Sequence, residues 1–346
     1  MISSNTKLAE AYIHYVGNKS IEQGFVISKQ NIDLTLELHD KLNKFFLEKF
    51  EQVFEFYQFY HQSSMSFHQL YNYIETFYNG SISFKELTQK IAALLYECST
   101  HPKIKPGELY ICNFKNVVFH DKEVEAIGIY KTEDKKGYLD INYQQESYKL
   151  RFKEGVDINK FDKGCLIFKD IENGNYTIAI IDNQNRSEEA QYWKELFLGV
   201  EPINNDYHQT NQFLKLTKNY VTKQLTEEFE VSKTDQIDIL NRSVEYFKSH
   251  EKFDKEEFET EVLYHPNIIE SFQKYNTDYR ETHEVTIDDI FDISNPAVKK
   301  QAKVFKSVLK LDKNFHIYIH GNKDMIEKGV EDNGRKYYKI YYNEEA

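Results

Sequence analysis

The chain has 346 residues and a formal net charge of −12 at pH 7, with 44 Lys and Arg against 56 Asp and Glu. Aromatic residues make up 15% of it, with only five Pro and 13 Gly, which excludes a disordered or collagen-like chain. Cys98, Cys112 and Cys165 are isolated from one another and form no CxxC pair, which argues against a disulfide framework or a zinc site.

The first hundred residues predict two strands followed by helices. Short apolar runs at residues 12–16 and 24–28 flank a Gly-Asn loop and indicate a strand, a loop and a strand. Over residues 33–61 the apolar positions recur at spacings of three and four, which predicts one long helix. Ser83 and Glu86 have the spacing of a capping box at the start of a second helix.

From Glu108 to Asp182 the period of the apolar residues changes to two, which predicts strands. The six expected strands are residues 109–114, 124–130, 138–143, 148–152, 165–168 and 176–181. Turn-forming residues separate them, so an antiparallel meander is the simplest arrangement. Ser187 is then expected to cap a helix that carries Trp193 and Phe197.

After Pro202 the helical pattern returns. Helices are expected at residues 210–224, 233–249, 254–263, 267–279 and 295–311, and residues 315–321 and 337–342 are expected to pair as a terminal hairpin. We therefore expect an α+β fold with two domains. Residues 1–200 would form a mixed domain with an antiparallel sheet and flanking helices, and residues 201–346 a helical domain ending in a short β-hairpin.

The helix expected at residues 295–311 is the most informative feature for function, because it contains no acidic residue in an acidic chain. Asn295 suits its N-cap and Pro296 its first helical position. At about 100° per residue, one arc is apolar and the opposite arc is basic. The apolar arc holds Val298, Ala302, Phe305, Val308 and Leu309, and the basic arc holds Lys299, Lys303, Lys306 and Lys310.

Such a stripe attracts DNA, because each phosphate neutralised by a lysine releases condensed counterions. An ordinary solvated helix face would have the same pattern. The candidate DNA-binding residues are Lys299, Lys300, Lys303, Lys306, Lys310 and Lys313, extended by Lys215 and Lys218 on the expected helix 210–224. Only five of the 44 basic residues are arginine, the usual reader of guanine, so we expect little sequence specificity.

The common catalytic signatures GxGxxG, GxxxxGK[ST], GxSxG and HExxH do not occur in the sequence. His316 and His320 would share one face of a strand and could approach a metal or a phosphate. The simpler explanation of this pattern is a half-buried strand whose polar side faces solvent, since the spacing places no carboxylate beside the two histidines as a further metal ligand. We expect no catalytic residue, cofactor or metal, and a metal-dependent nuclease or phosphodiesterase is the weakest alternative.

Long strings of residues resemble the bacterial nucleoid-associated protein family of the YejK/NdpA type. They are IHYVGNK at 13–19, STHPKIK at 99–105, DKGCLIF at 162–168, EAQYWK at 189–194, EFEVSK at 228–233, AVKKQAKVFKSV at 297–308 and FHIYIHG at 315–321. The resemblance spans essentially the whole chain and implies association with the compacted chromosome. It defines no catalytic residues.

We therefore expect a non-enzymatic DNA-binding protein of the cytoplasmic nucleoid. Neither a signal peptide nor a membrane span is expected, because no stretch approaches 18 apolar residues. The alternative is an adaptor that docks on chromosome-processing proteins through its acidic surfaces. The sequence leaves self-association open.

Overall fold

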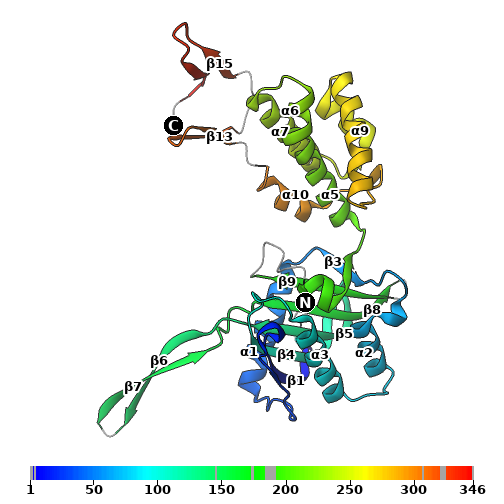
Figure 1. Ribbon diagram of the computed structural model, residues 1–346, viewed down its shortest axis with the longest axis vertical. Helices are drawn as coiled ribbons and strands as arrows, with labels where there is room; N and C mark the ends of the chain where they lie inside the picture. Colours follow the sequence, from blue (N-terminus) through cyan, green and yellow to red (C-terminus); the bar gives the residue numbers. More distant parts are fainter. Residues whose placement is uncertain are drawn as a thin grey trace. The chain divides into compact units, whose positions relative to one another are not determined.

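The computed structural model describes residues 3, 5–144, 146–172, 175–183, 192–305, 308–319 and 325–344. The chain divides into two compact units, Met1–Ile203 and Asn204–Ala346 (Figure 1). The predicted α+β fold is confirmed, with a large antiparallel sheet in unit 1, and helices followed by short strands in unit 2. None of the described helices is long and apolar enough to cross a membrane.

Among the described residues of unit 1, eight strands form one antiparallel sheet in the order β10-β3-β9-β8-β5-β4-β1-β2. The strands are β1 (Lys7–Val16), β2 (Phe25–Val26), β3 (Phe56–Phe59), β4 (Gly107–Phe119), β5 (Lys122–Thr132), β8 (Lys163–Glu172), β9 (Asn175–Asp182) and β10 (Val200–Pro202). The helical segments are η1 (Lys19–Ile21), α1 (Leu36–Leu47), η2 (Glu48–Gln52), η3 (Met65–Phe67), α2 (Gln69–Tyr78), α3 (Phe84–Cys98) and the π-helix η4 (Tyr192–Leu198).

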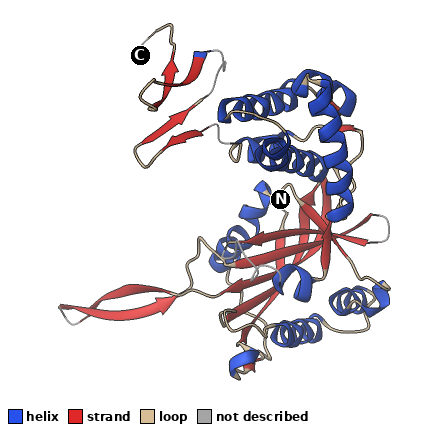
Figure 2. Cartoon of the chain, turned by 45° about the horizontal axis from the view of Figure 1, so that its top comes forward, coloured by secondary structure: helices blue, strands red, loops and turns tan. Residues whose placement is uncertain are grey.

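Both faces of this sheet are buried, and helices lie on both of its sides (Figure 2). Leu109 and Ile111 of β4 point to the core that contains α2, α3 and η4. Tyr110 and Cys112, which alternate with them, point to the core formed with α1 and η2. Side chains alternate across a strand, so one continuous apolar run in β4 supplies both cores.

At the start of the chain the expected strands are confirmed, since Tyr15 pairs with Val26. The capping box of Ser83 and Glu86 is confirmed as well. The expected helix 33–61 is wrong at its end, because residues 56–59 form β3 between β9 and β10. Alternating burial of these residues and their three aromatic rings favour a strand there. Helix α2 was not predicted.

All six strands expected from the period of two are present, but only four belong to the sheet. Strands β6 (Lys136–Gln144) and β7 (Ser147–Gly155) pair with each other, while β5 pairs directly with β8. They form a separate ribbon that extends away from the sheet (Figure 1). The predicted cap Ser187 lies outside the described residues, and the helix predicted after it is the π-helix η4, with Trp193 and Phe197 buried.

Unit 2 is built on an aromatic core. Its helical segments are α5 (Asp206–Asn219), the π-helix η5 (Tyr220–Gln224), α6 (Leu225–Glu228), α7 (Lys233–Ser249), α8 (Lys255–Phe258), the π-helix η6 (Glu259–Leu263), α9 (Pro266–Thr282) and α10 (Asn295–Ala302). A two-stranded sheet pairs β11 (Lys252–Asp254) with β12 (Ile290–Asp292). Phe213 lies at the centre, with Phe253 and Phe258 at ring distances of 4.3 and 5.0 Å. The four helical regions expected before residue 280 are confirmed.

The predicted helix 295–311 is wrong in its second half. Helix α10 ends at Ala302, and β13 (Val308–Leu311) pairs with β14 (Phe315–Tyr318). The predicted pairing of residues 315–321 with 337–342 is also wrong, because β15 (Ile326–Val330) pairs with β16 (Lys336–Ile340). In each of these two hairpins a short turn joins the paired strands, with Asp312 in the first turn and Gly334 in the second at positive φ. Pairing with the nearest strand in the sequence is favoured because closing a short loop costs little conformational entropy.

Candidate nucleic-acid interface

Helix α10 lies against α5 through its small and apolar residues. Ala297 and Val298 are buried, and Phe305, just after the helix, is also buried in the core of unit 2. The side-chain amide of Gln301 donates to Oδ1 of Asn211, and the backbone N–H of Ser294 donates to Oγ1 of Thr210 at 3.1 Å. These contacts fix which side of α10 faces solvent.

The opposite side of α10 carries the lysines. Lys299 and Lys300 are exposed in its last turn, and Lys303 is exposed at its C-cap. Lys300 also lies over the ring of Tyr207, with its Nζ 5.5 Å from the ring centroid. Within the described part of the chain, Lys299 and Lys303 make no ion pair. Positive charge at a helix C-terminus is favourable with the helix dipole, so these lysines also stabilise α10.

Helix α5, which packs against α10, carries two further predicted lysines. Asn211, Lys215 and Lys218 are spaced by four and three residues, and such residues share one helix face. Because Asn211 faces α10, this face of α5 is the one next to α10. Lys215 is exposed and Lys218 is half-buried. We call Lys215, Lys218, Lys299, Lys300 and Lys303 the α5–α10 lysine cluster.

The remaining predicted lysines do not continue this cluster as a helical stripe. Lys306 lies outside the described residues, and Lys310 belongs to β13. Lys313 is exposed in the turn between β13 and β14. Leu309 and Leu311, two residues apart, pack toward Ile237 of α7, so the chain uses a strand period there. Leu309 also lies four residues after Phe305, and this spacing led to the wrong prediction of a continuous helix.

Acidic groups gather at the start of α10 rather than at its end. Asp206 is the first residue of α5, and Asp292 lies shortly before α10. Burial, together with the nearby carboxylate of Asp292, raises the pKa of Asp206. The lysines lie at the far end of α10, one to two turns away. Along α10 itself, therefore, an acidic residue lies before the first turn and the lysines lie in and just after the last turn.

Of the two histidines considered for metal or phosphate chemistry, one lies within the described residues. His316 is exposed on β14, and His320 lies outside the described residues. A different group, His250, Glu257 and Glu261, offers three ligand atoms within 4.8 Å of one another. His250 Nδ1 bonds to the carbonyl of Tyr246 at 2.9 Å, and Tyr246 Oη donates to Glu257 at 2.9 Å. The fold itself explains this geometry, and we assign no metal to it.

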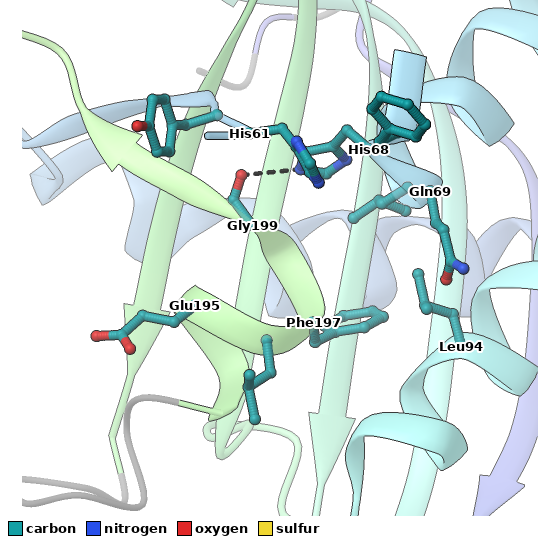
Figure 3. A pocket seen from close by; sticks show the side chains of 11 residues that line it. His61, His68, Gln69, Leu94, Glu195, Phe197 and Gly199 are labelled. Atoms are coloured by element: carbon teal, nitrogen blue, oxygen red, sulfur yellow. Dashed lines mark hydrogen bonds between the residues drawn. The ribbon is translucent and has the colours of Figure 1, made fainter. Parts of the chain in front are cut away.

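Unit 1 contains a cavity of about 220 Å³ between η3, α3 and η4. Figure 3 shows His61 and His68 on one wall, and Glu195 and Phe197 on the other. His68 Nε2 bonds to the carbonyl of Gly199 at 2.8 Å, and its Nδ1 accepts from the N–H of Tyr71 at 3.1 Å. Both ring nitrogens of His68 are therefore hydrogen-bonded to backbone groups. Burial lowers the pKa of His68. This histidine closes the wall of the cavity rather than serving as a base.

Sequence reasoning missed a buried ionic network in unit 1. Lys163 has a fully buried side chain and donates to both carboxylate oxygens of Asp182 at 3.0 Å. Lys131 is also buried and donates to Glu133 at 3.1 Å, and burial lowers its pKa. The only signal of it in the sequence was the position of Lys131 and Lys163 next to the predicted strands 124–130 and 165–168. The network satisfies its own charges, which is typical of a structural role.

The fold thus defines a class: an acidic α+β protein of two units, with a cluster of lysines on two packed helices of unit 2. The chain belongs to the family of the nucleoid-associated protein YejK, whose family model matches residues 13–335 and so covers most of the chain. The resemblance noted from the sequence is confirmed, and membership indicates a nucleoid-associated role. No curated protein matches the chain.

Proposed function

We propose that this chain is a non-enzymatic protein of the cytoplasmic nucleoid that binds DNA with little sequence specificity through the α5–α10 lysine cluster. The single observation that supports the proposal is the packing of α10 on α5, since α10 carries the exposed Lys299, Lys300 and Lys303 and α5 carries Lys215 and Lys218. Family membership supports a place on the nucleoid.

The chemistry of the cluster supports backbone contact. Lysine is a compact point charge that binds phosphate without the bidentate geometry with which arginine reads guanine. Contacts of this kind position a protein on the duplex but carry no sequence information. The net charge of −12 means that other surfaces repel DNA, which confines contact to the cluster.

The test is the salt dependence of DNA binding by the full chain. We expect log Kd to depend linearly on log salt, with a slope of about 0.9 for each phosphate contact. The variant Lys215→Gln/Lys299→Gln/Lys303→Gln keeps helix propensity and should lower that slope by up to about 2.7. Lys218 and Lys300 are left intact, because one is half-buried and the other lies over Tyr207.

A matched control removes three lysines elsewhere in unit 2. Lys248, Lys252 and Lys274 are exposed on α7, β11 and α9, so their replacement by Gln gives the same change of net charge. The control should keep the slope of the parent. Equal loss in both variants would mean that net charge, and not the cluster, sets the affinity.

The same experiment separates direct binding from the adaptor alternative, in which the chain reaches the chromosome through a DNA-bound protein. An adaptor of this acidity would show no salt-dependent DNA binding when purified. If the triple cluster variant is folded by circular dichroism and still binds DNA with the affinity of the parent, the α5–α10 lysine cluster is not the DNA-binding surface.

A further inference from the structure

The ribbon of β6 and β7 projects from unit 1 as an arm (Figures 1 and 2). Nine residue pairs join its strands, from Lys136 and Gly155 at the base to Gln144 and Ser147 near the tip. At about 3.3 Å per residue the arm is roughly 30 Å long. Among the described residues, neither strand pairs with any other strand.

The two faces of the arm differ sharply in polarity. One face carries three successive apolar rungs: Leu139 with Phe152, Ile141 with Leu150, and Tyr143 with Tyr148. These six side chains are 60–76% exposed, and the two tyrosine rings lie 5.0 Å apart. The other face carries Asp140, Lys149, Arg151 and Lys153. We call the six residues of the three rungs the apolar face of the arm.

The arm is held firmly at its base. Asp162, which follows the arm, accepts hydrogen bonds from the backbone N–H groups of Glu133 and Asp134, which precede it, at 2.6 and 3.2 Å. Lys136 and Asp157 form an ion pair of 2.5 Å across the same base. These contacts tie the two ends of the arm to the sheet, so the exposure of the apolar face belongs to an anchored element.

Such a face is not expected to remain in water. A two-stranded ribbon is at best marginally stable alone, and monomeric proteins rarely leave large contiguous apolar patches exposed. The six side chains expose on the order of 700 Å². Each partner contributes roughly 800 Å² to a protein interface of standard size. The apolar face is therefore large enough to hold one stable partner.

We propose that the apolar face of the arm packs against the same face of a second copy of this chain, with the two arms antiparallel. The middle rung is aliphatic and both outer rungs carry aromatic rings, so a reversed copy matches the order of the rungs. A two-fold axis through the middle rung makes such a contact self-complementary, and two sheets stack about 10 Å apart.

This arrangement also agrees with the distribution of charged side chains on the arm, and it keeps the rest of the two chains apart. The opposite face, which carries Asp140, Lys149, Arg151 and Lys153, turns outward on both arms, so none of these charges is buried. Antiparallel arms place the rest of the two chains at opposite ends of the pair. The inference does not rest on DNA binding, because the lysine cluster belongs to the other unit.

The first test is sedimentation equilibrium of the full chain. The parent should sediment with twice its mass of 41.3 kDa at micromolar concentration. The variant Ile141→Thr/Tyr148→Thr/Leu150→Thr removes apolar surface but keeps strand propensity, and it should weaken the dimer at least a hundredfold. The matched control Asn142→Thr/Lys149→Thr/Arg151→Thr alters the opposite face of the same strands and should remain a dimer.

A monomeric parent, or equal association of both triple variants, would overturn the proposal. A single-residue test covers the case in which the triple variant misfolds. In antiparallel arms the two copies of Ile141 face each other across the axis at the spacing of stacked sheets, about 10 Å, which is too long for a disulfide. A short bis-maleimide cross-linker spans that spacing, so it should join Ile141→Cys chains into a covalent dimer. It should not join Asn142→Cys chains, because residue 142 lies on the outer face. The parent chain, treated in the same way, measures the cross-linking that its own cysteines produce, and Cys112 and Cys165 are buried. Equal cross-linking of the two cysteine variants would rule out the proposed geometry.

Discussion

The side-chain amide of Gln301 on α10 donates a hydrogen bond to Oδ1 of Asn211 on α5, and both residues are buried. The two residues are 90 positions apart in sequence. This contact joins the two helices that carry the lysines of the proposed cluster.

We predict that Gln301→Ala destabilises the chain by about 1–3 kcal/mol, because it leaves the buried oxygen of Asn211 without its donor. Chemical denaturation of the full chain would measure this loss. A double-mutant cycle with Asn211→Ala should give a coupling energy of about 0.5–3 kcal/mol. Additive effects of the two changes would show that the contact contributes nothing to stability.

Phe305 is predicted to be a core anchor rather than a residue that stacks on bases. It is 4% exposed and packs in the core of unit 2, as its position on the apolar arc of the sequence indicated. Phe305→Ala should cost about 3–5 kcal/mol and lower the melting temperature, while DNA affinity falls only as far as the fold does.

Phe315→Ala is the control for Phe305, because Phe315 is 62% exposed and its loss should change stability little. Melting would be followed by circular dichroism, and DNA binding would be measured well below the melting temperature. A Phe305→Ala protein that melts like the parent but no longer binds DNA would assign a stacking role to this ring.

DNA binding through the lysine cluster should show weak base selectivity. Lysine contacts go to phosphates, so duplexes of unrelated sequence should compete within a few-fold of one another at constant salt. Competition between labelled and unlabelled duplexes of equal length measures this directly. One strongly preferred sequence in a selection experiment would contradict it and would point to a reading element elsewhere.

The sequence predicted those elements whose cause is local. The capping box of Ser83 and Glu86 marks the start of α3, and both residues lie within one helical turn. The burial of Phe305 follows from the apolar arc that begins at Val298. In both cases the deciding residues lie within about ten positions of one another, so the sequence pattern contains the needed information.

Elements decided by distant contacts were not predictable in this way. The alternation in β6 and β7 predicts strands but does not reveal that they leave the sheet, because a period of two fits a covered face and an uncovered one equally. The lysines of the candidate site were visible in the sequence. The contact of their two helices through Asn211 and Gln301 is not encoded by any local pattern.

His14 gives a prediction about pH. It is 2% exposed in β1, and its Nδ1 accepts a hydrogen bond from the N–H of Ser28 at 3.1 Å. Burial lowers the pKa of His14 to about 4, below its usual 6.5. Protonation of Nδ1 would also remove the acceptor for Ser28. The folded state therefore favours the neutral ring.

Because the pKa of His14 is lower in the folded chain than in the unfolded chain, stability should fall as the pH falls from about 6.5 toward 4. Between pH 8 and pH 5 we expect a loss of about 2 kcal/mol from this residue. His14→Asn keeps an acceptor for Ser28 but does not titrate, so its free energy of unfolding should decline by that much less over the same range. Denaturant unfolding at both pH values measures the difference. Parallel declines of the parent and His14→Asn would show that protonation of His14 does not affect stability.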